Sequence, residues 1–431
     1  MSIPSTEQLD FSYYHFFIYS DTGSCIYKHS SQTASPESIG AMQGIIQALF
    51  FSSHDLNCTL HLLSTDLGAL AYKHFTFKDN VLLLCIIFPN FYGNESLTEQ
   101  IVLNLLDLIY RCLLIHIGIT DLFSFNKSND IEMLRRYLEI YEQSITHLIT
   151  HHSSLQYLLK AERKYEIEKD TIYSVKYYLE KIKNKLKLDL VCLTIRNVVV
   201  WASNDWLNID ISDRLIFIMI AELYGNYDIN EIPIYFSKTL LEDEGIGKIS
   251  YRLFSVNLMK DTKMILLSDN DVTIDAIDLT IFDDFFISRI INMKNIIVFN
   301  NDIIDQNAKC VVVVNTVART FKVMLDEGES EKMWKFIVNC AFVKDLFENE
   351  STNNTNTNNN ALTYSEFYLK NFDEETFYFY KADNEITFLL LFDKDKTFDD
   401  INSVKLTLKN MKDVLDNKDN YKDSTTDYNP Q

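Results

Sequence analysis

The residues whose spacing could support chemistry are few, and the first of them are two histidines. His147 and His151 lie four residues apart in a segment of helical pattern, so that both imidazoles could face one metal ion. The helical zinc-protease motif requires glutamate after the first histidine, and here that residue is Leu148. We therefore interpret the pair as solvated side chains near a helix C-terminus, where positive charge is favourable. No metal site is predicted.

A short glycine-containing stretch, Gly245–Lys248, has a weak likeness to a phosphate-binding loop. That loop requires serine or threonine after its lysine, but Ile249 follows here. The acidic run 242–244 would also repel a phosphate. The sequence contains no GxSxG motif and no convincing Cys/His arrangement. We therefore expect a plain turn, no catalytic residue and no cofactor, which favours a non-enzymatic protein. An enzyme whose site is assembled only in space is the competing hypothesis.

Composition excludes some classes of partner. The chain has 431 residues, of which 47% are hydrophobic, so it can bury sizeable cores. Lys and Arg number 40 against 61 Asp and Glu, which gives a formal charge of −21. Binding to nucleic acid depends on clustered cations, so this balance predicts no nucleic-acid partner. It also argues against general attraction to anionic lipid, although it leaves open a local basic patch and peripheral membrane contact.

The compartment follows from the cysteines and the apolar stretches. The seven cysteines are scattered, form no CxxC pair and lie mostly in apolar runs, as buried free thiols do in a reducing cytosol. The first ten residues carry no Lys or Arg, so no secretory signal is expected. The longest apolar stretch, 97–119, contains Asp107 and Arg111, which are costly in a bilayer. We expect a cytoplasmic protein with no transmembrane segment.

The elements that would position any site recur in one order. In the first window, periodicity and turn residues predict a hairpin, a helix, three strands and two helices. Their ranges are Phe16–Tyr19, Cys25–His29, Pro36–Phe51, Cys58–Leu63, Ala69–Phe75, Val81–Phe88, Leu97–Ile117 and Ile131–Ile149. The helix Pro36–Phe51 is apolar on more than one side, so we expect one face to meet its own sheet and another to meet a partner or a neighbouring module.

Two later windows repeat this order after a charged helical connector, Leu158–Lys187, which we interpret as solvated. The second window is predicted to contain Leu190–Ile195, Val198–Trp201, a helix Ser212–Tyr224 with Ser212 as its N-cap, Ile232–Phe236, Ile249–Leu258, Lys263–Leu267 and a helix Ile274–Asn292. The third is predicted to contain Cys310–Val314, Ala318–Leu325, a helix Glu329–Phe347, Tyr364–Leu369, Thr376–Tyr380, Ile386–Phe392 and a helix Thr397–Leu415.

The repeated order predicts an α+β fold of three modules, each β-β-α-β-β-β-α, with a small, mostly antiparallel sheet packed against helices. We place these modules at 12–152, 170–296 and 308–416. An insertion rich in Asn and Thr near 351–360 and the tail 417–431 are expected to be disordered.

This order resembles the longin fold, and its triplication resembles the tri-longin proteins. Within these, the chain is most similar to the Fuzzy family. The segments that carry the resemblance are Tyr72–Phe75 leading into Val81–Phe88, Gly118–Leu122 followed by Ile131–Leu138, Ile232–Tyr235 and Cys310–Leu325. The Mon-type vacuolar-fusion subunit shares the pattern of the first module and is the alternative. Mon-type subunits usually carry a long N-terminal extension, whereas here the first predicted strand begins near residue 14.

The resemblance implies longin-like modules in a non-enzymatic subunit. Fuzzy-type proteins pair with an Inturned-like tri-longin subunit and join a WD-repeat subunit in a planar-cell-polarity effector complex. The pair acts as a guanine-nucleotide exchange factor for a Rab-family small GTPase and supports cilium assembly and intraflagellar transport. This implies a location at the cytoskeleton of the ciliary basal body; the Mon-type alternative implies endolysosomal fusion. In such pairs the first modules form the GTPase-facing surface, so we assign partner binding to Glu37, Met42, Gln43 and Ile46 of the first helix.

Overall fold

The computed structural model defines most of the strands and the helices between the first two sheets. The residues it describes are 13–31, 44–46, 48, 61–65, 68–89, 95–124, 128–152, 154–163, 169–225, 228–236, 249–259, 261–269, 272–281, 308–315, 319–324, 366–370, 375–381 and 386–393. The chain divides into two compact units. Unit 1 comprises 1–157 and 173–290, and unit 2 comprises 158–172 and 291–431.

Unit 1 contains two five-stranded antiparallel sheets with the same strand order. The first sheet runs β2-β1-β5-β4-β3 and the second runs β8-β7-β11-β10-β9. The strands of the first sheet are β1 (His15–Ser20), β2 (Cys25–Ser30), β3 (Leu62–Thr65), β4 (Gly68–Phe77) and β5 (Asn80–Pro89). Those of the second are β7 (Leu190–Ile195), β8 (Val198–Ala202), β9 (Ile229–Phe236), β10 (Ile249–Met259) and β11 (Thr262–Ser268).

The first sheet is buried on both faces, which explains why β1 and β5 read as continuous apolar runs. Alternate residues of β1 belong to different clusters. Phe16 and Ile18 lie in the large core with α2 (Glu95–Ile117), whereas Phe17 and Tyr19 pack on the opposite side with Ile46. The hairpin between β1 and β2 turns at Gly23, which has a positive φ of 76°.

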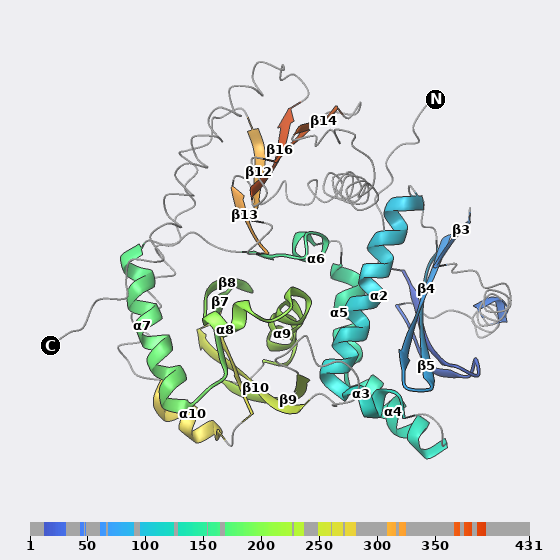
Figure 1. Cartoon of the computed structure of the whole chain (residues 1–431), viewed down its shortest axis with the longest axis horizontal. Helices are drawn as coiled ribbons and strands as arrows, with labels where there is room; N and C mark the ends of the chain where they lie inside the picture. Colours follow the sequence, from blue (N-terminus) through green and yellow to red (C-terminus); the bar gives the residue numbers. More distant parts are fainter. Residues whose placement is uncertain are drawn as a thin grey trace, which may run out of the picture. The chain divides into compact units, whose positions relative to one another are not determined.

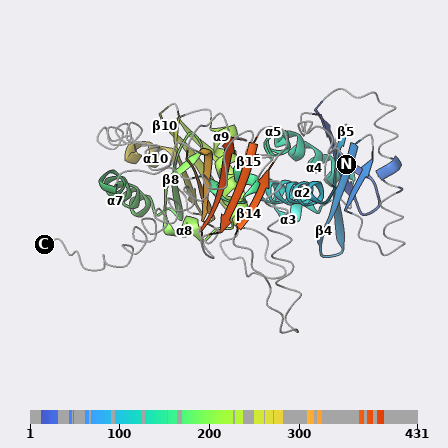
Figure 2. The ribbon, with the colours of Figure 1, turned by 90° about the horizontal axis from the view of Figure 1, so that it is seen from above.

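The second sheet is connected and covered in a similar way. Arg196 and Asn197 link β7 to β8, and both have positive φ, 50° and 61°, as a type I′ hairpin requires. Helix α9 (Ile211–Tyr224) covers one face. Helices α7 (Lys169–Leu186) and α10 (Ile274–Ile281) lie on the side of this sheet away from α9 (Figures 1 and 2). A short helix, α8 (Asn204–Leu207), joins β8 to α9.

A layer of helices separates the two sheets of unit 1 (Figure 1). It consists of α2, α5 (Glu142–His151) and α9, and residues of both sheets and all three helices form one hydrophobic cluster. Gly118, with φ of 81°, ends α2 so close to β9 that an added Cβ would lie 3.1 Å from the Tyr235 ring. The first two predicted modules therefore share one core.

Unit 2 contains a third antiparallel sheet whose main strands follow the same order. Its strands are β12 (Ala308–Asn315), β13 (Thr320–Met324), β14 (Glu366–Lys370), β15 (Glu375–Lys381) and β16 (Ile386–Asp393). They are arranged β14-β15-β16-β12-β13, and a two-residue strand, β6 (Glu162–Arg163), adds to β13 in parallel. The backbone N–H of Glu162 donates to the Arg319 carbonyl at 2.8 Å. A piece of the connector thus belongs to the third sheet.

The α+β class with antiparallel sheets is confirmed, and three sheets share one strand order. The strand predictions agree with the observed strands to within a few residues wherever these are described. The predicted helices Glu329–Phe347 and Thr397–Leu415, the insertion near 351–360 and the tail 417–431 lie outside the described residues. The module boundaries 12–152, 170–296 and 308–416, and the identity of the modules as longin-like, stay predictions.

Three local predictions were wrong. The single helix Ile131–Ile149 is two helices, α4 (Ser128–Ile140) and α5, because Tyr141 leaves helical geometry at φ −98° and ψ 13°. The connector Leu158–Lys187 is not helical throughout, because Glu162 and Arg163 form β6 between α6 (Leu155–Leu158) and α7. The N-cap of α9 is Asp210, whose carboxylate accepts the N–H of Ser212 at 2.9 Å. A further one-turn helix, α3 (Ile119–Leu122), was not predicted.

The end of α9 provides a stability test on a glycine pair. A Cβ at Gly225 would lie 2.2 Å from the Ala221 carbonyl oxygen and 2.6 Å from the Ser255 hydroxyl. We expect Gly225→Ala to lower the free energy of unfolding by about 1–3 kcal/mol, measured by urea denaturation. Gly44→Ala is the matched control, because nothing lies within 4 Å of its added Cβ and alanine favours a helix. Equal stability of the two variants would contradict this packing.

Candidate interaction surface

The structure describes one of the four residues predicted to bind a partner. Glu37, Met42 and Gln43 lie outside the described residues. Ile46 is 2% exposed and packs with Phe17, Tyr19, Leu70, Tyr72, Leu83 and Cys85 on the face of the first sheet away from α2. The Ile46 side chain therefore anchors its helix to its own sheet, and its predicted contact with a partner is not tested.

The neighbouring helical residues point outward. Ile45 is 56% exposed, and Gly44 and Ala48 are exposed as well. We call Gly44, Ile45 and Ala48 the outer face. Its residues are small or apolar and carry no charge, although they lie next to solvent. A single exposed isoleucine is common on protein surfaces, but it can contact another apolar surface because the other side of its helix packs on the sheet. Among the described residues of the predicted helix, 44–46 and 48, the outer face comprises those that are exposed.

A group of polar residues lies inside the helical layer and contains a serine beside a histidine. His116 Nε2 of α2 is 3.1 Å from the Ser144 hydroxyl of α5, which is 3.0 Å from the Tyr224 hydroxyl of α9. The His116 ring stacks on Tyr141, with centroids 4.0 Å apart. A nucleophilic serine needs a histidine base at this distance, but it also needs access to substrate.

Burial decides the role of this cluster. Ser144 is 0% and His116 is 3% exposed, so a substrate cannot reach them in this structure. Among the described residues, the Nδ1 of His116 has no hydrogen-bond partner that could orient the ring as the triad carboxylate does. Burial lowers the pKa of His116 to about 3 and raises the pKa of the nearby Cys112 thiol to about 12, so both side chains are neutral at pH 7. In the described structure the cluster is a buried polar link between three helices.

A group of ion pairs lies at the N-terminal end of α9, opposite the end that carries Tyr224. Arg111 Nη1 of α2 lies 2.8 Å from Asp210 Oδ1 and 3.2 Å from Asp213 Oδ1. Because Asp210 also caps α9, the arginine links α2 to the first turn of α9. This explains how Arg111, which argued against a membrane span, is accommodated near a hydrophobic core.

The two histidines interpreted as solvated differ in exposure, because His151 is exposed whereas His147 is partly buried. The His147 and His151 rings stack with centroids 4.2 Å apart, and burial lowers the pKa of His147 to about 4. Within the described ranges, no three His, Cys, Asp or Glu side chains converge as metal ligands. Gly245–Lys248 lies outside those ranges. No helix in the described part of the chain is long and apolar enough to cross a membrane.

Comparison of the sequence with models of known protein families finds no match, and comparison with curated proteins finds none either.

Sequence reasoning did not assign partner binding to Ile45, which is 56% exposed beside the buried Ile46. From the sequence, the helix Pro36–Phe51 is apolar on more than one side, and partner binding is assigned to Glu37, Met42, Gln43 and Ile46. The signal that could have found Ile45 is periodicity: once Ile46 faces the sheet, its neighbour lies about 100° around the helix. The buried cluster gave no sequence signal, because its members come from three helices and meet only in the fold.

The cluster predicts a pH dependence of stability. The folded-state pKa of His116, about 3, lies below the ordinary value of 6.5. Between those values the unfolded chain binds a proton that the folded chain does not, so stability is complete above pH 6.5 and is lost as pH falls toward 3. Replacing His116 by phenylalanine removes the imidazole that binds this proton in the unfolded chain. We expect His116→Phe to weaken the pH dependence of the unfolding free energy by up to about 1.4 kcal/mol per pH unit in urea titrations between those values.

Tyr224→Phe is the control for that experiment. It removes a hydroxyl from the same cluster but keeps His116, so it should lower stability while leaving the pH dependence unchanged. A His116→Phe variant with the full wild-type pH dependence would show that the imidazole is not kept neutral by burial. His152, whose pKa burial lowers to about 4, contributes in the same direction in both variants.

Proposed function

We propose that this chain is a non-enzymatic subunit of a ciliogenesis and planar-cell-polarity effector complex, similar to the Fuzzy family. In this proposal it pairs with an Inturned-like tri-longin subunit, and the pair acts as a guanine-nucleotide exchange factor for a Rab-family small GTPase. A WD-repeat subunit completes the complex, which acts at the basal body. The alternative is a Mon-type subunit of an endolysosomal exchange factor.

The observation that carries the proposal is the triplication of one strand order in three separate sheets. The resemblance to tri-longin proteins predicts three modules of one architecture, and the repeated order supports it. The outer face gives further support, because it presents Ile45 to solvent on the helix assigned to partner binding. Both observations concern architecture and surface, and neither identifies the GTPase.

Exchange is compatible with a site that has no catalytic side chains. An exchange factor binds the nucleotide-free state of a GTPase more tightly than the nucleotide-bound state, and this difference in affinity expels the nucleotide. Such binding requires a rigid surface of the right shape. The packing of Ile46 against the first sheet supports a fixed position for the outer face.

Ile45→Asp tests the proposal on the outer face. A carboxylate in an apolar contact should weaken binding about tenfold or more, because it would be desolvated without a partner. The measurement is recovery of the tri-longin partner and of a Rab-family GTPase by affinity purification, followed by the GDP release rate of the purified complex. Ile140→Asp is the matched control, because Ile140 is 61% exposed on α4, away from this helix.

The results of these experiments distinguish the Fuzzy-like, Mon-type and enzyme hypotheses. Loss of partner and GTPase with Ile45→Asp but not with Ile140→Asp supports the outer face as the contact. Recovery with location at basal bodies favours the Fuzzy-like role, and location on late endosomes favours the Mon-type role. If the wild-type chain recovers neither a tri-longin subunit nor a small GTPase, both readings are wrong. Turnover of a nucleotide or small substrate by the isolated chain would favour an enzyme.

A further inference from the structure

Helix α7 carries a basic and aromatic surface on an acidic protein. Helix α7, Lys169–Leu186, contains five lysines and two acidic residues, Asp170 and Glu180, whereas the whole chain has a formal charge of −21. Lys183 pairs with Asp205 of α8, and Lys176, Lys181 and Lys185 are exposed. The connector interpreted from the sequence as a solvated helix of mixed charge therefore contains a local excess of positive charge.

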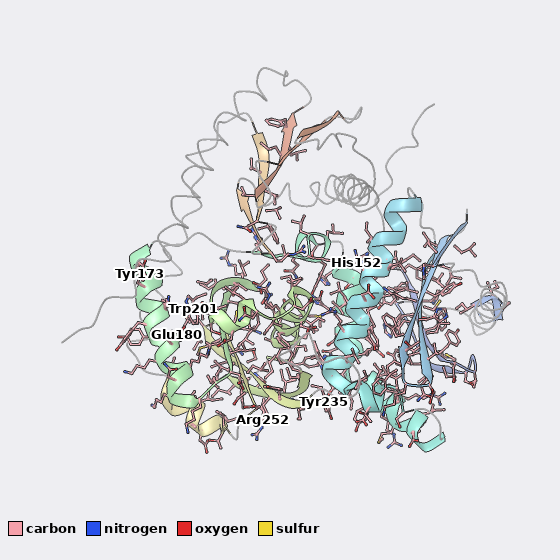
Figure 3. The ribbon with its side chains drawn as sticks, viewed as in Figure 1. His152, Tyr173, Glu180, Trp201, Tyr235 and Arg252 are labelled. Atoms are coloured by element: carbon pink, nitrogen blue, oxygen red, sulfur yellow. The ribbon has the colours of Figure 1, made fainter. Side chains whose placement is uncertain are left out.

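Two tyrosines lie between these lysines on the outer side of α7. Val175, Leu179 and Ile182 are buried, which fixes the inner side of the helix. Tyr173 and Tyr177, four residues apart, are 58% and 65% exposed on the opposite side. Tyr173 and Glu180 are labelled on this helix in Figure 3. With about 100° per residue, Lys181 and Lys185 fall on one flank of the tyrosines and Lys176 falls on the other, with Glu180 between Lys176 and the tyrosines.

We infer that this surface, which we call the α7 face, binds an anionic lipid bilayer. The positive flanks are complementary to anionic headgroups, and each lysine near such a surface adds to the attraction. Exposed tyrosines are favoured at the depth of the headgroups, because the ring is apolar and the hydroxyl remains hydrated. Long lysine side chains can extend beside them toward the phosphates.

A protein partner fits the α7 face less well. Protein interfaces are enriched in tyrosine and arginine but depleted in lysine, and the exposed cations here are all lysine. Lysine is a compact, strongly hydrated charge without the planar fork that recognises a carboxylate in two places. The net charge of −21 does not prevent the contact, because physiological salt screens charges beyond about 8 Å. The inference does not rest on the proposed exchange role.

The test is sedimentation of the full chain with lipid vesicles at physiological ionic strength. We expect binding to phosphatidylcholine vesicles that contain phosphatidylserine and little binding to vesicles of phosphatidylcholine alone. The variant Lys176→Gln/Lys181→Gln should weaken binding about tenfold, because two charges near the surface are lost. Tyr173→Ser/Tyr177→Ser should weaken it as well, although it leaves the charge unchanged. Circular dichroism checks that each variant is folded.

The matched control is Lys28→Gln/Lys78→Gln, which makes the same change in charge at two exposed lysines outside α7. Wild-type affinity in this control, with weakened binding in both α7 variants, supports the inference. Vesicle binding that is absent, independent of phosphatidylserine or unaffected by the α7 variants overturns it. Binding of the chain to soluble polyglutamate through α7, without sedimentation with vesicles, would overturn the lipid assignment and indicate an acidic protein segment as the partner.

Discussion

A layer of helices that must bury both of its sides is the constraint on which unit 1 depends. Helix α9 has nine consecutive buried residues, Asp213–Ala221, so its central turns are buried on every side. A helix apolar nearly all round is stable only between two other layers. The two sheets supply those layers, and their shared cluster means that neither sheet would keep its core if the other were removed.

Polar groups in this layer set the arrangement of the helices. An apolar interface alone tolerates sliding and repacking, whereas a buried polar atom needs a partner at a defined place. His116, Ser144 and Tyr224 meet at one level of the layer, and Arg111 reaches Asp210 at another. Two such links between α2 and α9, one neutral and one charged, fix both the separation and the register of the pair. Gly118 then permits the close approach of β9.

The sequence predicted the elements better than the contacts between them. Strands such as β5 and β7 were found because a sheet buried on both faces produces unbroken apolar runs, and the Arg196-Asn197 turn was found because it separates two of them. The break at Tyr141 was missed because Tyr141 continues the helical pattern and its departure accompanies stacking on His116. Strand β6 was missed because two polar residues have no periodicity and pair only when β13 is present. The sequence does not show which of Ile45 and Ile46 is buried, because this depends on the position of the sheet against which the helix packs.

The layered arrangement also determines which surfaces remain for other molecules. The inner faces of both sheets are occupied by the shared helices, so in the described part of unit 1 these faces are not available to a partner. The outer coverings differ in chemistry: the outer face at Gly44, Ile45 and Ala48 is apolar and uncharged, whereas the α7 face is basic and aromatic. They lie on opposite sides of the two sheets (Figures 1 and 2). The two proposed contacts therefore use separate surfaces, and the shared hydrophobic core lies between them, so that each proposal can be tested without altering the other surface.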